Sequence, residues 1–114
     1  MVAERIKQLI NLPNTYIGEA PIAVDSCQWI RPAAGNSTVY FAKETYDRPA
    51  FSIYVRDKSN EEAARRCEAA FKGIRNYTDS LSSLLVRRLP SFVGKDDKHR
   101  SVYVFSIEYQ TGGY

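Results

Sequence analysis

The chain has few of the residues on which metal, disulfide and membrane functions depend. Its 114 residues include one histidine and two cysteines, Cys27 and Cys67. These three side chains cannot form a tetrahedral zinc site unless carboxylates or a second subunit complete it. No hydrophobic run approaches the ~20 residues that a membrane-spanning helix needs, and the charged N-terminal segment lacks the pattern of a secretory signal. We therefore expect a cytosolic location and two free cysteines of structural use only.

Candidate catalytic groups are equally sparse. His99 lies in a hydrophilic segment, and no orienting carboxylate or substrate cleft can be placed beside it from the sequence. The neighbouring aspartates could serve, but a charged loop is the simpler interpretation. Cys27 follows an aspartate and a serine, yet no base lies nearby. Because no phosphate-binding, metal-ligating or dinucleotide motif is present, the sequence predicts neither an enzyme nor a cofactor.

Length and charge indicate one small domain with a modest basic surplus. A chain of this length can bury one core, so we expect a single domain over residues 1–114. The net charge is +3, and residues 1–57 hold six basic and six acidic side chains, so the surplus lies in the second half. The surplus forms one basic cluster: Arg87, Arg88, Lys95, Lys98 and Arg100. A dedicated nucleic-acid-binding protein usually shows a stronger footprint.

The clearest structural pattern lies between residues 49 and 76. Phe51, Ile53 and Val55 alternate with polar residues, as in a half-buried strand. Ser59 and Glu62 then form a capping box, in which each side chain can bond to the other residue's amide. The helix that follows places five small or apolar residues on one face: Ala63, Cys67, Ala70, Phe71 and Ile74. Its acidic and basic residues form three expected i,i+4 pairs: Glu61 with Arg65, Glu62 with Arg66, and Glu68 with Lys72.

The remaining patterns predict a short N-terminal helix and four more strands. Residues 2–12 are expected to be helical up to Pro13, and residues 16–24 to be extended but irregular. Strands are expected at 26–31, 38–43, 82–89 and 102–110, the last in a central position because both of its faces carry apolar residues. Pro90 is expected to end its strand, which leaves residues 91–100 as a mobile loop between two antiparallel neighbours.

This element order predicts an α+β fold. We expect a largely antiparallel β-sheet of about five strands, with a long helix packed on one face and a short N-terminal helix. Tyr54 falls opposite the apolar face of its strand, whereas Tyr103 and Tyr109 share a face with Phe105 and Ile107. Tyrosine is enriched at interfaces but also favours strands, so both interpretations of these residues stay open.

One segment resembles a known protein family. Residues 47–56 (DRPAFSIYVR) run into residues 59–63 (SNEEA) and a helix of about four turns. This order is similar to a segment of the minor capsid and tail-terminator proteins of long-tailed phages and prophages. The opening helix, the irregular stretch that follows it, and the closing strand with its polar tail (FSIEYQTGGY) also fit that family.

The resemblance implies an architectural role in the virion. Such proteins have an α+β fold and form a ring, typically sixfold, which caps the tail tube and joins it to the head after assembly in the host bacterial cytoplasm. The implied partners are further copies of the chain, tail-tube and head-connector proteins, and DNA in passing contact, with no membrane and no small-molecule substrate. A heterologous ring requires two different patches on each subunit. The candidate interface residues are Tyr54, Arg87, Arg88, Lys95, Lys98 and Arg100.

Two other classes of function remain open. The first is a small basic nucleic-acid-binding module, in which exposed tyrosines would stack on bases beside Arg87, Arg88 and Lys98. The balanced charge of the first half speaks against it. The second is an enzyme acting through His99 or Cys27, for which the sequence offers no supporting arrangement.

Overall fold

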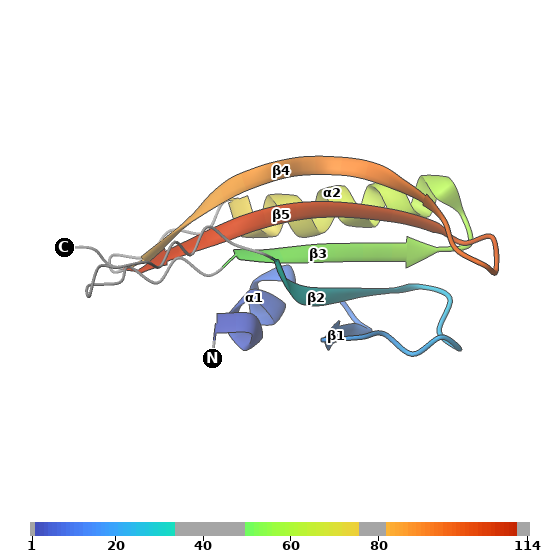
Figure 1. Cartoon of the computed structure of the whole chain (residues 1–114), viewed down its shortest axis with the longest axis horizontal. Helices are drawn as coiled ribbons and strands as arrows, with labels where there is room; N and C mark the ends of the chain where they lie inside the picture. Colours follow the sequence, from blue (N-terminus) through green and yellow to red (C-terminus); the bar gives the residue numbers. More distant parts are fainter. Residues whose placement is uncertain (1, 34–49, 76–81, 112–114) are drawn as a thin grey trace.

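The computed structural model describes residues 2–33, 50–75 and 82–111, which form an α+β fold (Figure 1). In chain order the elements are α1 (Val2–Ile10), β1 (Thr15–Ile17), β2 (Cys27–Ala33), β3 (Ala50–Asp57), α2 (Asn60–Arg75), β4 (Ser82–Lys95) and β5 (Ser101–Thr111). The strand expected at 38–43 lies outside the described residues. The helix α2 has 16 residues, a common length in globular domains rather than the long helix expected.

The five strands form one mixed sheet in the order β1-β2-β3-β5-β4. β1 is parallel to β2, and the other neighbouring pairs are antiparallel. The expectation of a largely antiparallel sheet is therefore wrong at this edge. The irregular stretch after α1 contributes three paired residues, and the chain then turns back before β2. Alternating side chains reveal a strand, but they do not reveal its partner or direction. The central position expected for the last strand is confirmed, since β5 lies between β3 and β4.

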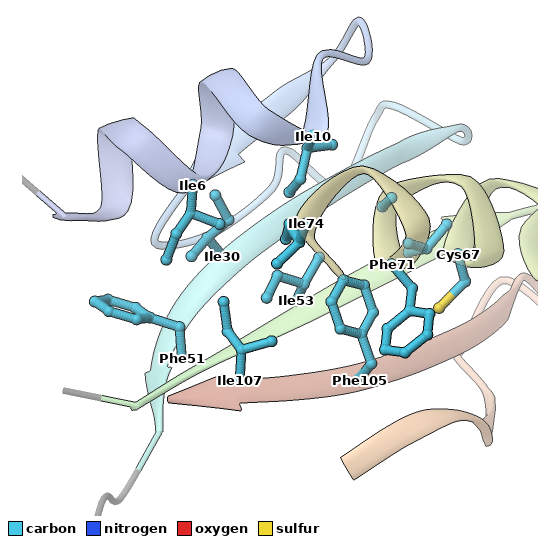
Figure 2. Close-up of a cluster of buried hydrophobic side chains, with 12 residues drawn as sticks. Ile6, Ile10, Ile30, Phe51, Ile53, Cys67, Phe71, Ile74, Phe105 and Ile107 are labelled. Carbon is cyan, nitrogen blue, oxygen red and sulfur yellow. The ribbon is translucent and has the colours of Figure 1, made fainter. Parts of the chain in front are cut away.

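Both helices pack on one face of the sheet, where their apolar side chains meet those of β2, β3 and β5 (Figure 2). The face of α2 expected from the sequence is confirmed, because all five of its residues are buried. Phe71 meets Phe105 of β5 edge to face, with ring centroids 5.5 Å apart and planes at 82°. Ile6 and Ile10 extend the cluster from α1. One continuous core therefore lies between the two helices and the sheet.

The start of α2 follows the capping pattern only in part. The amide of Glu62 donates to Oγ of Ser59 over 3.3 Å, as expected. The amide of Ser59 instead donates to Oδ1 of Asp57 over 3.1 Å, and Glu62 pairs with Arg65. Two of the expected pairs are thus replaced. Arg65 pairs with Glu62 instead of Glu61, and Arg66 pairs with Asp57 at the end of β3 instead of Glu62. The spacing of residues along a helix cannot predict a competing partner from another element.

At Gly73 the helix α2 lies close to the backbone of α1. A Cβ atom added at this position would lie 2.9 Å from the backbone oxygen of Leu9 in α1. Real side chains do not approach a backbone atom so closely, so the absence of a side chain lets α2 pack directly on the backbone of α1. The glycine in this helix therefore has a packing role.

The first half of the loop expected at residues 91–100 belongs to strand β4. β4 continues through Pro90 to Lys95, and its pairing with β5 shifts register at three places between Val86 and Gly94. Proline is tolerated here because β4 is an edge strand and its bulged positions need not donate to a partner. Only residues 96–100 connect the two strands, and they form hydrogen bonds with one another. The expectation of a ten-residue loop is therefore wrong, because the connection has five residues.

Candidate functional site

The sheet face opposite the helices carries a mixture of aromatic and polar side chains. We call it the second sheet face and define it by Trp29, Arg31, Ser52, Tyr54, Val104 and Ser106, which the strand register places together. Tyr54 stacks on Trp29 of the neighbouring strand, with ring centroids 5.2 Å apart and planes at 10°. The guanidinium carbon of Arg56 lies 5.3 Å from the centroid of the same Trp29 ring. Both rings are half-buried, so they form a flat surface with limited freedom to move.

Two buried arginines hold the segment between β1 and β2 against one end of the sheet. Arg56 donates from Nη2 to the backbone oxygens of Pro21 and Val24, both over 2.6 Å. Arg100 donates from Nη1 to the backbone oxygens of Ile22 over 2.7 Å and Val24 over 3.2 Å. A bond from a charged donor is about twice as strong as a neutral one. These bonds therefore fix the backbone of this segment, although it forms no regular helix or strand.

A third arginine joins α2 to the same end of the sheet. Arg66 donates to the backbone oxygens of Cys27 over 3.0 Å and Arg56 over 2.7 Å. Its Nη1 also lies 3.1 Å from Oδ2 of Asp57, which accepts a further hydrogen bond of 2.9 Å from Ser26. The polar contacts thus connect the helix, β3 and the start of β2. These contacts stabilise the packing of α2 against the sheet at this end of the molecule.

The turn between β4 and β5 is organised by Asp96. Its Oδ1 accepts hydrogen bonds from the amides of Lys98 over 3.0 Å and Arg100 over 2.9 Å. Its Oδ2 accepts a bond of 2.9 Å from Nε of Arg100. His99, between these residues, is exposed and has a φ of 60°, which is the left-handed region that histidine adopts more readily than most residues. The turn therefore exposes His99 to solvent and holds its backbone in a left-handed conformation.

Two carboxyl groups at this end have a lowered pKa. The pKa of Asp25 lies below its ordinary value because of its hydrogen bond with Lys58, 3.3 Å away, and because of nearby Arg100. Burial acts to raise the pKa of Asp96, but the hydrogen bonds from the amide and side chain of Arg100 outweigh it and the pKa is lowered. Both carboxylates are therefore charged under ordinary conditions and partner cations of the same chain.

The six candidate interface residues fall in different places. Tyr54 lies on the second sheet face, and Arg88, Lys95 and Lys98 are exposed on β4 and the turn after it. Arg87 is also on β4, with Nε 3.9 Å from Oε1 of Glu108 on β5.

Arg100 differs from the other five, because only 2% of its surface is exposed. Its guanidinium donates hydrogen bonds to Asp96 and to the backbone oxygens of Ile22 and Val24. The basic residues of β4 thus lie on one edge strand of the sheet. Arg100, in contrast, is buried and stabilises contacts within the chain.

The long edge strand β4 also exposes apolar side chains. Leu89 is 66% exposed, and Val86, Phe92 and Val93 are exposed as well. Phe92 is partly supported by the ring of Tyr103, 5.3 Å away between centroids. Tyr103 shares the helix-side face with Phe105, as expected, and its hydroxyl donates to Oδ1 of Asn60 over 2.8 Å. The side chain of Tyr109 lies outside the described part of the chain.

Two more apolar residues are exposed in and after β1. Ile17 ends β1 on the edge of the sheet opposite β4 and is 46% exposed. Ile22 follows in the segment that Arg56 and Arg100 hold in place, and its side chain is 67% exposed. A single exposed isoleucine is common on protein surfaces, so Ile22 alone does not identify a contact.

The described residues offer little for catalysis. Within 2–33, 50–75 and 82–111, no group of three or more histidine, cysteine or acidic residues is placed to hold a metal ion, and no helix there is long and apolar enough to cross a membrane. Cys27 and Cys67 are free and buried, as expected. Burial raises the pKa of both thiols, that of Cys67 to about 12. A thiol that resists ionisation is a poor nucleophile.

Sequence reasoning missed the three structural arginines. Arg56, Arg66 and Arg100 contact carbonyls that lie between 10 and 78 residues away in the chain, and no local pattern reports such contacts. The extension of β4 past Pro90 had a detectable signal, since proline is compatible with an edge strand.

Comparisons with known proteins agree with the fold and point to one family. Residues 6–111 match the family described as bacteriophage tail terminator protein. A solved structure superimposes with a TM-score of 0.52 over 99% of this chain and 89% of its own length, at 16% sequence identity, which shows a likeness of fold alone. A comparison with curated proteins finds no match.

Proposed function

This chain belongs to the bacteriophage tail terminator family, and we propose that its copies form a ring that caps the tail tube and joins it to the head. Membership makes the protein a structural component of the phage virion. The single observation that carries the proposal is the family match, because residues 6–111 include the whole sheet, all of α2 and the second half of α1. The ring, its sixfold symmetry, the head-joining role and assembly in the host cytoplasm belong to the proposal.

The distribution of exposed side chains supports an assembly role. A closed ring of identical subunits needs two unlike patches on each copy. The chain has several unlike surfaces: the second sheet face with Tyr54, the basic and apolar edge of β4, and the apolar edge at β1. Tyr54, Arg87, Arg88, Lys95 and Lys98 remain the proposed contacts with neighbouring subunits, tube or connector proteins, whereas the buried Arg100 is withdrawn.

The state of the cysteines and of His99 also supports an architectural protein rather than an enzyme. The raised pKa values of Cys27 and Cys67 follow from burial in the fold. His99 lies in the exposed turn, where its neighbour Arg100 is already bonded to Asp96. The Cys27 thiol is buried and therefore inaccessible to a substrate, whereas His99 is exposed. We propose no enzymatic activity and no cofactor.

A tube-capping experiment tests this function. Tail tubes from the cognate phage, assembled without the terminator, are mixed with the purified chain and viewed by negative-stain electron microscopy. The proposal predicts a ring of added density at one end of each tube and a block to further addition of tube protein. Decoration along the sides, or no binding at all, would contradict it.

The nucleic-acid-binding alternative rests on the second sheet face. Tyr54 and Trp29 could offer aromatic surfaces, but their stacking uses one face of each ring. Bases would have to stack on the other face of each ring. A labelled single strand tests this alternative: retention that falls steeply with salt would favour it, and no retention at low salt would remove it.

A further inference from the structure

We propose that subunits contact one another head to tail, with the β4 edge of one copy against the β1 edge of the next. The β4 edge is defined by Arg88, Leu89, Phe92 and Val93, and the β1 edge by Ile17 and Glu19. This inference rests on the proposed ring and names the two surfaces that close it.

β1 and β4 are the two outermost strands, so the two edges lie on opposite sides of the sheet (Figure 1). Four strand spacings of about 4.8 Å separate the outermost strands, or about 19 Å. Within the described residues 2–33, 50–75 and 82–111, the two edge strands are therefore too far apart to contact each other. A contact between two different patches repeats from copy to copy and closes into a ring when the rotation allows.

Both edges expose apolar side chains from an ordered backbone. Leu89 is 66% exposed and Ile17 is 46% exposed, yet each belongs to a paired strand. Burying such side chains requires little further ordering of the backbone, which lowers the entropic cost of association.

The charges of the two edges are complementary. The sequence of β4 contains Arg87, Arg88 and Lys95 and no acidic residue, whereas residues 15–24 contain Glu19 as their one charged group. Two copies of the β4 edge would bring like charges together, and a β4 edge against a β1 edge would not. Charge thus favours the head-to-tail contact over a twofold contact between β4 edges.

The contact is made by side chains rather than by adding a strand to the sheet. Pro90 lacks a backbone donor, and the three register shifts bend β4 out of a regular ladder. An edge of this kind resists pairing with an arbitrary strand while its side chains stay accessible. This explains how a long apolar edge can persist in the free subunit without uncontrolled aggregation.

Paired cysteines test the contact directly. Leu89→Cys and Ile17→Cys are made singly and together in the full chain, and mild oxidation is followed by denaturing gel electrophoresis. The native cysteines are buried and stay silent. The double variant is expected to give a ladder of covalent multimers larger than dimers, and each single variant only monomers. A matched control, Leu89→Cys with Lys72→Cys on the exposed surface of α2, is expected to give no ladder.

The possible outcomes separate this inference from the proposed function. A covalent dimer from Leu89→Cys alone would show a twofold contact and overturn the head-to-tail arrangement. Rings seen by microscopy without a ladder from the double variant would overturn the edge contact and leave the ring intact. A chain that forms neither rings nor ladders contradicts both.

Charge reversal gives a second, independent readout. Arg88→Glu and Glu19→Lys are each expected to raise the concentration needed for assembly by about tenfold or more, because each puts like charges together. The double reversal is expected to restore assembly. Failure of the double variant to recover, with each single variant folded, would show that these two residues do not face each other.

Discussion

Arg100 donates a hydrogen bond from Nε to Oδ2 of Asp96 over 2.9 Å, and the same guanidinium reaches back to the backbone oxygen of Ile22 over 2.7 Å. One side chain thus closes the β4–β5 turn and fixes the segment after β1. The basic residues near the turn therefore divide into two kinds. Arg100 acts inside the fold, whereas Lys98 points into solvent.

Arg100→Ala is expected to destabilise the chain by about 3 kcal/mol, because it leaves Asp96 and two backbone oxygens without their charged donor. Lys98→Ala is the matched control, and as an exposed substitution it should change the free energy of unfolding by no more than about 0.5 kcal/mol. Urea denaturation measures both. Equal stabilities for the two variants would show that the buried contacts of Arg100 do not hold the turn.

Gly73→Ala is expected to lower the melting temperature even though alanine favours helices by about 1 kcal/mol. The added methyl group would lie 2.9 Å from the backbone oxygen of Leu9, and forcing α1 away costs about 1–3 kcal/mol. Ala69→Gly, at an exposed position of the same helix, controls for propensity and should also destabilise. A stabilised Gly73→Ala variant would contradict the close approach of α1 and α2.

Both cysteines are expected to stay unreactive in the folded chain. Burial raises the pKa of Cys27, and that of Cys67 to about 12, so few thiolates exist near neutral pH. A colourimetric thiol reagent should detect almost none in the native protein and two per chain in denaturant without reductant. Detection of fewer than two under denaturing conditions would indicate a disulfide and refute the assignment of free thiols.

Stability is expected to fall in acid as Asp96 and Asp25 become protonated. Their pKa values are lower in the folded chain than the ordinary value of 3.8. The folded state then binds fewer protons than the unfolded state. Their contribution is therefore complete above that value and is lost as pH falls through the folded pKa. The difference in melting temperature between the unaltered chain and Asp96→Asn should shrink below pH 3.8. A constant difference from neutral pH to pH 2 would contradict a role for the carboxylate charge.

The parts of the fold that follow from local pattern could be predicted. The buried face of α2 repeats at helical spacing, and Phe51, Ile53 and Val55 alternate along β3, so each set identifies its own element. The central place of β5 also follows from its two apolar faces. These features depend on residues that are near neighbours in the chain.

The parts that depend on distant partners could not be predicted. β1 contributes only three residues, and nothing in them shows that they run parallel to β2. The roles of Arg56, Arg66 and Arg100 depend on carbonyls that the folded chain brings to them. The candidate interface residues were chosen as a basic cluster, and only the fold separates the exposed Arg88 from the buried Arg100.

The native mass of the assembled protein tests the central claim most directly. Sedimentation velocity of the full chain, over concentrations that span the micromolar range and with and without tail tubes, measures it. The account predicts one discrete species, as a closed ring requires, and the proposed sixfold symmetry sets its mass near six times the 13.0 kDa chain mass. A chain that stays monomeric throughout, on tubes as well as free, or one that forms an open-ended series of sizes, would contradict it.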